Sequence, residues 1–403
     1  MKYLFVACLL CLSVLSAVAK VPAMNKIRLT NNWEYLKGDL GGIWEAVRPA
    51  APGSSEAVPI WQPVTLPHCF NAEDAVDPDV NYYEGPGWYK TLLAIDNPYR
   101  NGRIVLDFDG AGQKTDVYVY TTHVGSHVGG YDSWNVDITD AVKAFLGSKD
   151  AERFKGKVPL SIRCDNSRDL EMIPSDLADF NIYGGLYRYL NLVYLPEVSF
   201  EQIGLESSLS SNLKEGILKV KTSFYNPEDI RKADVTVSVY DVDRKPVFSK
   251  TLEGILPLGD QLLAEMKIKN PVLWDVDVPQ LYTCELTVKT PDQTFTTEER
   301  FGFRHTEFKD KGPFFLNGKR LLLRGTHRHE DHAGVAQAMT EDMMRREMRM
   351  MKDMGVNFIR LGHYQQSEII LDLCDELGIL VWEEIPWCRG GLGGDVYKKQ
   401  ARR

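Results

Sequence analysis

The amino-acid sequence predicts a multidomain β plus α/β protein. Over residues 20–197, runs rich in β-branched and aromatic residues alternate with Gly, Asn, Asp and Pro, which favours an antiparallel jelly-roll sandwich. Residues 198–303 carry shorter alternating strands, as in a small immunoglobulin-like sandwich. From residue 304 to residue 403, strands alternate with amphipathic helices, and this order favours parallel strands. At 403 residues the chain is long enough for several domains.

The composition disfavours several classes of protein. Hydrophobic residues make up 44% of the chain and charged residues 26%, as in a soluble globular protein. The net charge of −9 and the pI near 5.5 disfavour a surface that tracks phosphates, so we expect no nucleic-acid partner. The acidity itself is that of an ordinary solvated surface.

The first residues are typical of a secretory signal peptide. Lys2 precedes an apolar run over residues 3–19, which ends in an Ala-Val-Ala cleavage site. The run is shorter than the ~20 residues that a membrane-spanning helix needs, and no later segment is apolar enough to span. The sequence therefore predicts a cleaved signal peptide over residues 1–19, no membrane span, and a secreted or periplasmic mature protein.

The cysteines lack the spacing of a disulfide framework or of a thiolate metal site. Two of the seven lie in the predicted signal peptide, and the remaining five form no CxxC pair. Although secretion would permit disulfides, we expect these five to be buried free thiols. They are Cys69, Cys164, Cys284, Cys374 and Cys388.

Eight segments of the two β units have the composition of strands. In the first unit they are Arg103–Gly110, Lys114–Tyr120, Val158–Asp165 and Tyr187–Leu195. In the second unit they are Ile217–Asn226, Asp234–Asp241, Leu262–Lys269 and Leu281–Lys289. A helical period is visible only weakly, near Val142–Leu146.

The α/β unit begins with a predicted buried strand over Lys319–Gly325. A helix is expected next, with Thr340 as its N-cap and Gly355 at its end. Its methionines recur on one face, which favours core packing over a cofactor site. They are Met344, Met348 and Met351.

Two further strands complete the predicted unit. They cover Val356–Gly362 and Gly378–Glu384, with a helix between them that has Ser367 as its N-cap and Gly378 after its end. Strand-helix-strand order predicts parallel strands, whose carboxyl ends meet at one edge of the sheet.

Polar side chains gather at the predicted carboxyl ends of all three strands. They are Thr326, His327, Arg328, His329, Glu330 and Asp331 after the first strand, Arg360, His363 and Tyr364 after the second, and Glu383, Glu384 and Trp387 after the third. Random loop polarity would seldom place such groups after three strands in a row. The sequence therefore predicts a functional rim at this edge.

The HxHxxH spacing of His327, His329 and His332 raises the possibility of a zinc site. We expect His327 and His329 to point to opposite sides of the strand end, so hydrogen bonding to a substrate is favoured over metal binding. Arg360 is either an ion-pair partner of Glu383 or Glu384, or a group of the substrate site, and the sequence leaves this open.

Motifs along most of the mature chain identify a family. They are GGYDSWNVDIT (Gly129–Thr139), DFNIYGGLYR (Asp179–Arg188), NPVLWDVDVPQLYTCELTV (Asn270–Val288), FGFR (Phe301–Arg304), FFLNGKRLLLRGTHRHEDH (Phe314–His332), NFIRLGHY (Asn357–Tyr364) and CDELGILVWEEIP (Cys374–Pro386). In this order they resemble glycoside hydrolase family 2, the β-galactosidase and β-glucuronidase family. The resemblance implies a sugar-binding jelly roll, a central immunoglobulin-like domain and the first three strands of an incomplete TIM (β/α)8 barrel.

The resemblance also implies four substrate-binding residues. His329 matches the histidine at the end of the family's first barrel strand, and His363 matches the histidine of the second; both contact sugar hydroxyls in the family. Asp179 matches the aspartate by which the jelly roll reaches a hydroxyl in the active site, and Arg360 matches the arginine near the nucleophilic carboxylate. Neutral histidines and carboxylates suit polyol recognition, because they accept hydroxyl hydrogens.

The catalytic carboxyl groups of the family are not expected in this chain. A retaining glycosidase needs two carboxyls about 5 Å apart. In the family both lie on later barrel strands, with the acid/base in an Asn-Glu pair, and no Asn-Glu occurs after the predicted signal peptide. Glu383 and Glu384 are adjacent and face opposite ways, so they cannot be that pair. The sequence predicts the amino-terminal portion of an enzyme, inactive alone, with its catalytic residues beyond Arg403.

No metal or other cofactor is expected. Some members of the family bind magnesium through a Glu and a His shortly after the third barrel strand. The matching stretch here, residues 388–391, is Cys-Arg-Gly-Gly and offers no carboxylate ligand.

The preferred activity is that of a secreted β-galactosidase, with β-glucuronidase and β-mannosidase as alternatives within the family. A glucuronidase needs cationic or amide partners for the sugar carboxylate, and in the family these lie beyond Arg403. A non-catalytic carbohydrate-binding protein is the second interpretation, with Trp88, Trp134 and Tyr183 as candidates for stacking on sugar rings. A zinc hydrolase is the third. We expect a carbohydrate as the partner, and homo-oligomers are common in the family.

Overall fold

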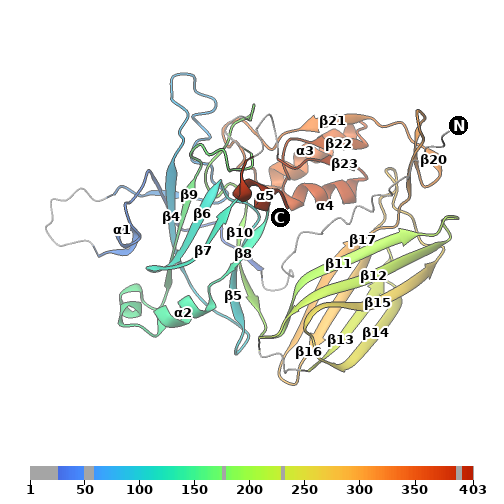
Figure 1. Cartoon of the computed structure of the whole chain (residues 1–403), viewed down its shortest axis with the longest axis horizontal. Helices are drawn as coiled ribbons and strands as arrows, with labels where there is room; N and C mark the ends of the chain where they lie inside the picture. Colours follow the sequence, from blue (N-terminus) through green and yellow to red (C-terminus); the bar gives the residue numbers. More distant parts are fainter. Residues whose placement is uncertain (1–25, 50–58, 175–177, 228–231, 387–392, 403) are drawn as a thin grey trace, which may run out of the picture.

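The computed structural model describes residues 26–49, 59–174, 178–227, 232–386 and 393–402. They form two β-sandwiches and an α/β unit, which follow one another along the chain (Figure 1). This multidomain β plus α/β architecture confirms the predicted fold class. The predicted signal peptide lies outside the described residues. No helix of the described part is long and apolar enough to cross a membrane.

The first unit is a sandwich of two antiparallel sheets. Its strands are β1 (Lys26–Arg28), β2 (Trp33–Lys37), β3 (Gln62–Val64), β4 (Pro86–Leu93), β5 (Arg103–Phe108), β6 (Lys114–Val119), β7 (Thr122–Val128), β8 (Trp134–Asp137), β9 (Val158–Asp165) and β10 (Leu190–Leu195). One sheet has the order β1-β10-β5-β8 and the other β3-β2-β4-β9-β6-β7. The helices are α1 (Trp44–Val47), α2 (Thr139–Leu146) and a 3-10 helix (Lys149–Phe154).

Strand β10 is buried along its whole length because it separates two cores. Leu190, Leu192 and Tyr194 belong to the core of the first sandwich. Val193 and Leu195, which point the other way, belong to the core of the second unit. A strand covered on both faces requires a nearly continuous apolar run, and this explains the sequence LNLVYL.

The second unit is also a sandwich of two antiparallel sheets. Its strands are β11 (Ser199–Leu209), β12 (Glu215–Tyr225), β13 (Ala233–Tyr240), β14 (Pro246–Ile255), β15 (Gly259–Lys269), β16 (Tyr282–Lys289) and β17 (Thr294–Phe301), in the orders β11-β12-β15 and β14-β13-β16-β17. The four segments expected as strands correspond to β12, β13, β15 and β16. The sequence did not single out β14, because most of its residues are exposed and no apolar alternation marks it.

The third unit contains the parallel sheet that the sequence predicts. Strands β21 (Gly325–Arg328), β22 (Phe358–Leu361) and β23 (Leu380–Glu383) pair in parallel, in the order in which they occur in the chain. Helices α3 (Glu341–Asp353) and α4 (Glu368–Leu377) connect them, and α5 (Asp395–Arg402) follows. The Thr340 and Ser367 side chains cap α3 and α4 as predicted, and Met344 and Met348 are buried in the core of this unit.

The predicted position of the first parallel strand, Lys319–Gly325, is wrong. Lys319–Arg320 forms β20 of a small antiparallel sheet with β18 (Thr306–Phe308) and β19 (Phe314–Leu316), and the parallel strand β21 starts only at Gly325. Leu321 and Leu323 instead pack against Trp274 and its neighbours, and Leu322 is 70% exposed. The apolar run therefore joins the α/β unit to the second sandwich.

The cysteines of the described residues are buried and form no disulfide, as predicted. They are Cys69, Cys164, Cys284 and Cys374. The fifth, Cys388, lies outside the described residues, together with the rest of the stretch considered for magnesium.

Candidate active site

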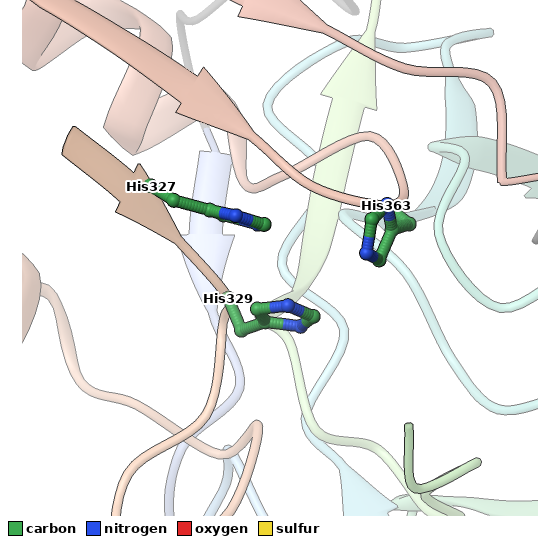
Figure 2. Close-up of side chains that lie close together, drawn as sticks. All are labelled: His327, His329 and His363. Carbon is green, nitrogen blue, oxygen red and sulfur yellow. The ribbon is translucent and has the colours of Figure 1, made fainter. Parts of the chain in front are cut away.

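Three histidines meet at the carboxyl ends of the first two parallel strands. His327 lies on β21, His329 follows that strand directly, and His363 follows β22. Figure 2 shows their rings facing one common space. The possible ligand atoms of the three rings all lie within 4.8 Å of one another. The predicted polar rim thus includes a compact histidine cluster, formed by these three residues.

The expectation that His327 and His329 point to opposite sides is wrong. Their ring centroids lie 4.8 Å apart and the ring planes differ by only 20°. Residues two apart on an extended chain share a face, because the side-chain period of a strand is two. His332 is not part of the cluster; it is exposed, and its Nδ1 lies 3.0 Å from the Ala333 carbonyl oxygen.

An arginine and a carboxylate support the cluster from the neighbouring strands. Arg360 on β22 donates from Nε to Glu384 Oε1 over 2.7 Å, and its Nη1 lies 3.1 Å from His327 Nδ1. His363 Nδ1 lies 2.8 Å from Glu384 Oε2. Of the alternatives for Arg360, the ion pair with Glu384 is therefore present, and the same arginine also borders the cluster.

Partial burial and neighbouring charges lower the pKa of two of the histidines. Burial lowers the pKa of His327, and the positive charge of Arg360 lowers it further. Burial also lowers the pKa of His329, assisted by the other two histidines and opposed by the charges of Asp331 and Asp179. Neutral imidazoles can accept hydrogen bonds as well as donate them.

Glu384 keeps its charge although it is partly buried. Burial raises its pKa, but the hydrogen bonds from His363 and Arg360 outweigh that effect and leave the pKa below its usual range. The adjacent Glu383 differs, because it accepts a hydrogen bond from the Gln366 backbone N–H over 3.1 Å and burial raises its pKa. The two adjacent carboxylates thus have different partners, as the opposite directions of their side chains predict.

The jelly roll supplies one wall of the candidate site. The Phe180 ring centroid lies 6.1 Å from that of His329 and 6.0 Å from that of His363. Asp179 precedes it, is exposed, and is close enough for its charge to raise the pKa of His329. The structure therefore brings together all four residues for which the sequence predicts substrate binding: Asp179, His329, Arg360 and His363.

A buried ion pair beneath the site joins the jelly roll to the parallel sheet. Arg188 Nη2 lies 2.5 Å from Glu330 Oε2, and the two side chains are only 2% and 0% exposed. Arg188 also donates to the backbone carbonyls of Tyr131 and Gln365. Both charged residues stand in the quoted motifs, but their pairing could not be derived from the sequence, because 142 residues separate them.

Models of one family match all three units. The model described as the sugar binding domain of glycosyl hydrolases family 2 matches residues 40–196. A second model, described as glycosyl hydrolases family 2, matches residues 198–304, and the TIM barrel domain model of the same family matches residues 307–394. The chain belongs to glycoside hydrolase family 2. It is therefore part of a glycosidase family that hydrolyses glycosyl bonds.

Solved structures of β-glucuronidases match almost the whole chain. A β-glucuronidase from Parabacteroides merdae, solved with glycerol in its active site, is 99% identical, with a TM-score of 0.94 over 96% of this chain and 49% of that chain. β-Glucuronidase 3 from Bacteroides uniformis is 58% identical, with a TM-score of 0.90 over 95% of this chain and 48% of that chain.

A β-galactosidase from Thermoanaerobacter pseudethanolicus is 28% identical over 384 residues, which cover 92% of this chain and 48% of that protein. The chain thus spans about half the length of each of these relatives. The three-stranded parallel sheet with its helices is the part of the barrel that this family 2 sequence contains among its described residues.

Other side chains cover the rings of the three candidates for stacking on sugars. Trp88 is 3% exposed and donates from its indole N–H to Asp39 over 3.0 Å. Trp134 is partly buried and stacks on both Phe108 and His127, with ring centroids 4.0 and 4.6 Å away. Tyr183 is also 3% exposed, and its hydroxyl donates to Asp331. None of the three offers an open ring face, so the interpretation of exposed stacking platforms is wrong for them.

Chemically, the histidine cluster can bind a polyol or, after rearrangement, a metal ion. Imidazoles, an arginine and carboxylates around one space supply both donors and acceptors for hydroxyl groups. Zinc would need ring nitrogens at about 2.0–2.1 Å from the ion, and hence closer to one another than the separations of up to 4.8 Å found here. The arrangement as it stands favours a ligand with several hydroxyls.

Proposed function

We propose that this chain supplies the sugar-binding half of a retaining β-glucuronidase. The observation that carries the proposal is the 99% identity, over 96% of the chain, to the Parabacteroides merdae β-glucuronidase. The preference for a β-galactosidase, which the sequence motifs suggested, is replaced, because the β-galactosidase relative is only 28% identical. β-Glucuronidase was the stated alternative within the same family.

The geometry of the histidine cluster supports a role in holding the sugar ring. Asp179, His329, His363 and Arg360 are the proposed substrate-binding residues, and they approach one space from the jelly roll and from two parallel strands. We infer that the two catalytic carboxyls are supplied by another part of the complete enzyme. In the described residues, Glu383 and Glu384 are engaged by Gln366, His363 and Arg360.

The substrate is tested by comparing two nitrophenyl glycosides on the complete enzyme that contains this sequence. A site built for the sugar carboxylate should reject the neutral analogue, so kcat/KM for the β-D-glucuronide should exceed that for the β-D-galactoside by at least about a hundredfold. Faster turnover of the galactoside would overturn the proposal. The isolated 403-residue chain should hydrolyse neither compound.

The proposed binding residues are tested in the same enzyme by single substitutions. His329→Ala and Asp179→Ala should each lower kcat/KM about tenfold or more, because each removes a hydrogen bond to a hydroxyl and leaves that hydroxyl unpaired in the site. His332→Ala is the matched control, since His332 is exposed and lies outside the cluster. Equal effects of the three substitutions would contradict the assignment.

We also propose that the protein is exported by a cleaved signal peptide over residues 1–19. The support is the sequence pattern alone: Lys2, the apolar run and the Ala-Val-Ala site. Amino-terminal sequencing of the mature protein should begin at Lys20. An intact Met1 on protein recovered from outside the cytoplasm would contradict the proposal.

A further inference from the structure

His327 is the member of the histidine cluster to which the family resemblance gives no role. One of its ring nitrogens, Nδ1, lies 3.1 Å from Arg360 Nη1. The other, Nε2, has no hydrogen-bond partner among the described residues. It lies against Gly362, whose lack of a side chain leaves room for the ring: a Cβ on that glycine would stand 2.5 Å from the nitrogen.

The contact with Arg360 decides which nitrogen of His327 carries the proton. A guanidinium has only donors, so Nδ1 must accept the hydrogen bond. The ring is neutral near pH 7, because burial and the charge of Arg360 lower its pKa. A neutral imidazole that accepts at Nδ1 carries its single proton on Nε2, so His327 presents an N–H donor to the space of the cluster.

The contact with Glu384 assigns the opposite form to His363. An ionised carboxylate has only acceptors, so the Nδ1 that lies 2.8 Å from Glu384 Oε2 must carry the proton. Arg360 Nη2 approaches the same nitrogen at 3.2 Å, but the carboxylate is nearer and has the charge that attracts an N–H. The Nε2 of a neutral His363 is then a bare lone pair, and it acts as an acceptor.

We propose that Arg360, besides its proposed role in binding substrate, acts with Glu384 to fix opposite tautomers of His327 and His363, and that His327 is a further substrate-contacting residue. His327 donates its Nε2–H to one hydroxyl of the bound sugar, while His363 accepts a hydrogen bond from another. The two rings thereby distinguish a hydroxyl that must accept from one that must donate. The identity of the ligand as a sugar rests on the proposed function, but the assignment of the tautomers does not.

The same assignment disfavours the cluster as a zinc site. A metal ion needs a lone pair from each of its ligand nitrogens. The Nε2 of His327 carries a proton, and its Nδ1 lone pair is taken by Arg360. Zinc could therefore use all three rings only after His327 had changed its tautomer and lost the contact with Arg360.

The tautomers are tested by nitrogen NMR on the full 403-residue chain labelled with 15N-histidine, near pH 8. Protonated and bare ring nitrogens differ strongly in chemical shift, and His327→Asn and His363→Asn identify the two residues. We expect His363 as the Nδ1–H form, which is the minor form of a free imidazole in water, and His327 as the Nε2–H form. In Glu384→Gln, His363 should shift towards the Nε2–H form. An Nε2–H form of His363 in the unsubstituted chain would overturn the proposal.

The contact with substrate is tested on the complete enzyme. His327→Ala should raise KM about fivefold to tenfold with a smaller change in kcat, because one neutral hydrogen bond to the sugar is lost. Gly362→Ala places a Cβ 2.5 Å from Nε2, so the imidazole must move away from its present position, and KM should rise similarly. The donor role is tested with glucuronides in which single hydroxyls are replaced by hydrogen or by fluorine, which can accept a hydrogen bond but not donate one. At the position that His327 contacts, replacement by hydrogen should weaken binding to the unsubstituted enzyme, and fluorine should restore it. In His327→Ala, fluorine at that position should not restore binding.

The two experiments separate the possible failures. If the tautomers are as assigned but His327→Ala leaves KM unchanged for glucuronides and galactosides alike, the contact of His327 with substrate is refuted. If KM rises only for a galactoside, the donor role of His327 stands and the proposed glucuronide specificity fails. Stoichiometric zinc on the unsubstituted chain, lost in His327→Asn, would replace the proposal by a metal site.

Discussion

The pKa of His68, in the first sandwich, is set by burial alone. Burial lowers its pKa from 6.5 to about 4, with no neighbouring charge among the causes. Its Nδ1 lies 2.8 Å from the Tyr89 hydroxyl, and its ring packs on Tyr35. The folded protein therefore holds this imidazole neutral at pH values where an unfolded chain would protonate it.

Acid should weaken the first sandwich through His68. Between pH 6.5 and about 4 the unfolded chain binds a proton at this residue and the folded chain does not, so the unfolding free energy falls as the pH is lowered through that window. Labelling with 13C-histidine gives eight resonances, and the one that disappears in His68→Gln should titrate near pH 4. His332→Gln, at an exposed position, is the control, and a His68 midpoint near 6.5 would contradict the expectation.

The residues of the site that could be predicted from the sequence are those whose position follows from strand ends. His329, His363 and Arg360 were found because polar groups after parallel strands gather at one edge. The direction of His327 was predicted wrongly, although the two-residue period of a strand was sufficient to place it beside His329. The pairing of Arg360 with Glu384 rather than with Glu383 is visible only in the folded structure.

At the scale of elements, periodicity located the helices better than the first parallel strand. Helices α3 and α4 have apolar faces, capping side chains and terminal glycines, and these local signals fix their ends. The apolar run near residues 321–323 looked like a buried strand, but only Leu321 and Leu323 are partly buried, against the second sandwich, and Leu322 is exposed. The strand that does form, β21, has the sequence GTHR, and it carries His327 of the histidine cluster.

The turn after α4 depends on a glycine that touches another unit. Gly378 has a φ of +70°, and a Cβ there would stand 2.3 Å from the backbone oxygen of Val276. Gly378→Ala should therefore destabilise the α/β unit by about 2–4 kcal/mol, since backbone strain adds to a clash that no side-chain rotation relieves. Hydrogen exchange of α4 amides in the full chain should accelerate correspondingly.

Gly355, after α3, provides the matched control for that substitution. Its φ is +86°, but a Cβ there would meet nothing within 4 Å. Gly355→Ala should cost only the backbone strain, about 1–2 kcal/mol. If the two substitutions accelerated exchange equally, the contact with Val276 would contribute nothing to the stability of the turn.

At the scale of the whole molecule, the site depends on contacts that hold the three units in fixed positions relative to one another. The two faces of strand β10 pack in the cores of the two sandwiches. Trp274 of the second sandwich donates its indole N–H to the Asp375 carbonyl of the α/β unit at 2.8 Å. Sequence patterns predicted the type of each unit, since periodicity and turn residues are local. They could not predict these contacts between units, because long-range pairing leaves no local pattern.

Substitutions in the ion pair between Arg188 and Glu330 test the contact between the jelly roll and the parallel sheet. Glu330→Gln would leave the guanidinium buried without its counter-charge, which should cost about 3–5 kcal/mol. The double variant Arg188→Met, Glu330→Leu should recover much of that loss, because an apolar pair of similar volume removes the unpaired charge. Hydrogen exchange at Ser367, whose N–H donates to Glu330, reports the change where the jelly roll meets the sheet.

The exposed pair of Arg244 and Glu298 in the second sandwich shows what an ion pair does without burial. Its atoms lie 2.7 Å apart, but the side chains are 57% and 42% exposed. Solvent screens such a pair, so Glu298→Gln should leave exchange at Ser367 and overall stability within measurement error of the unsubstituted chain. If Glu330→Gln were equally silent, the jelly roll would be held against the sheet by apolar packing alone, and the buried pair would only fill space between them.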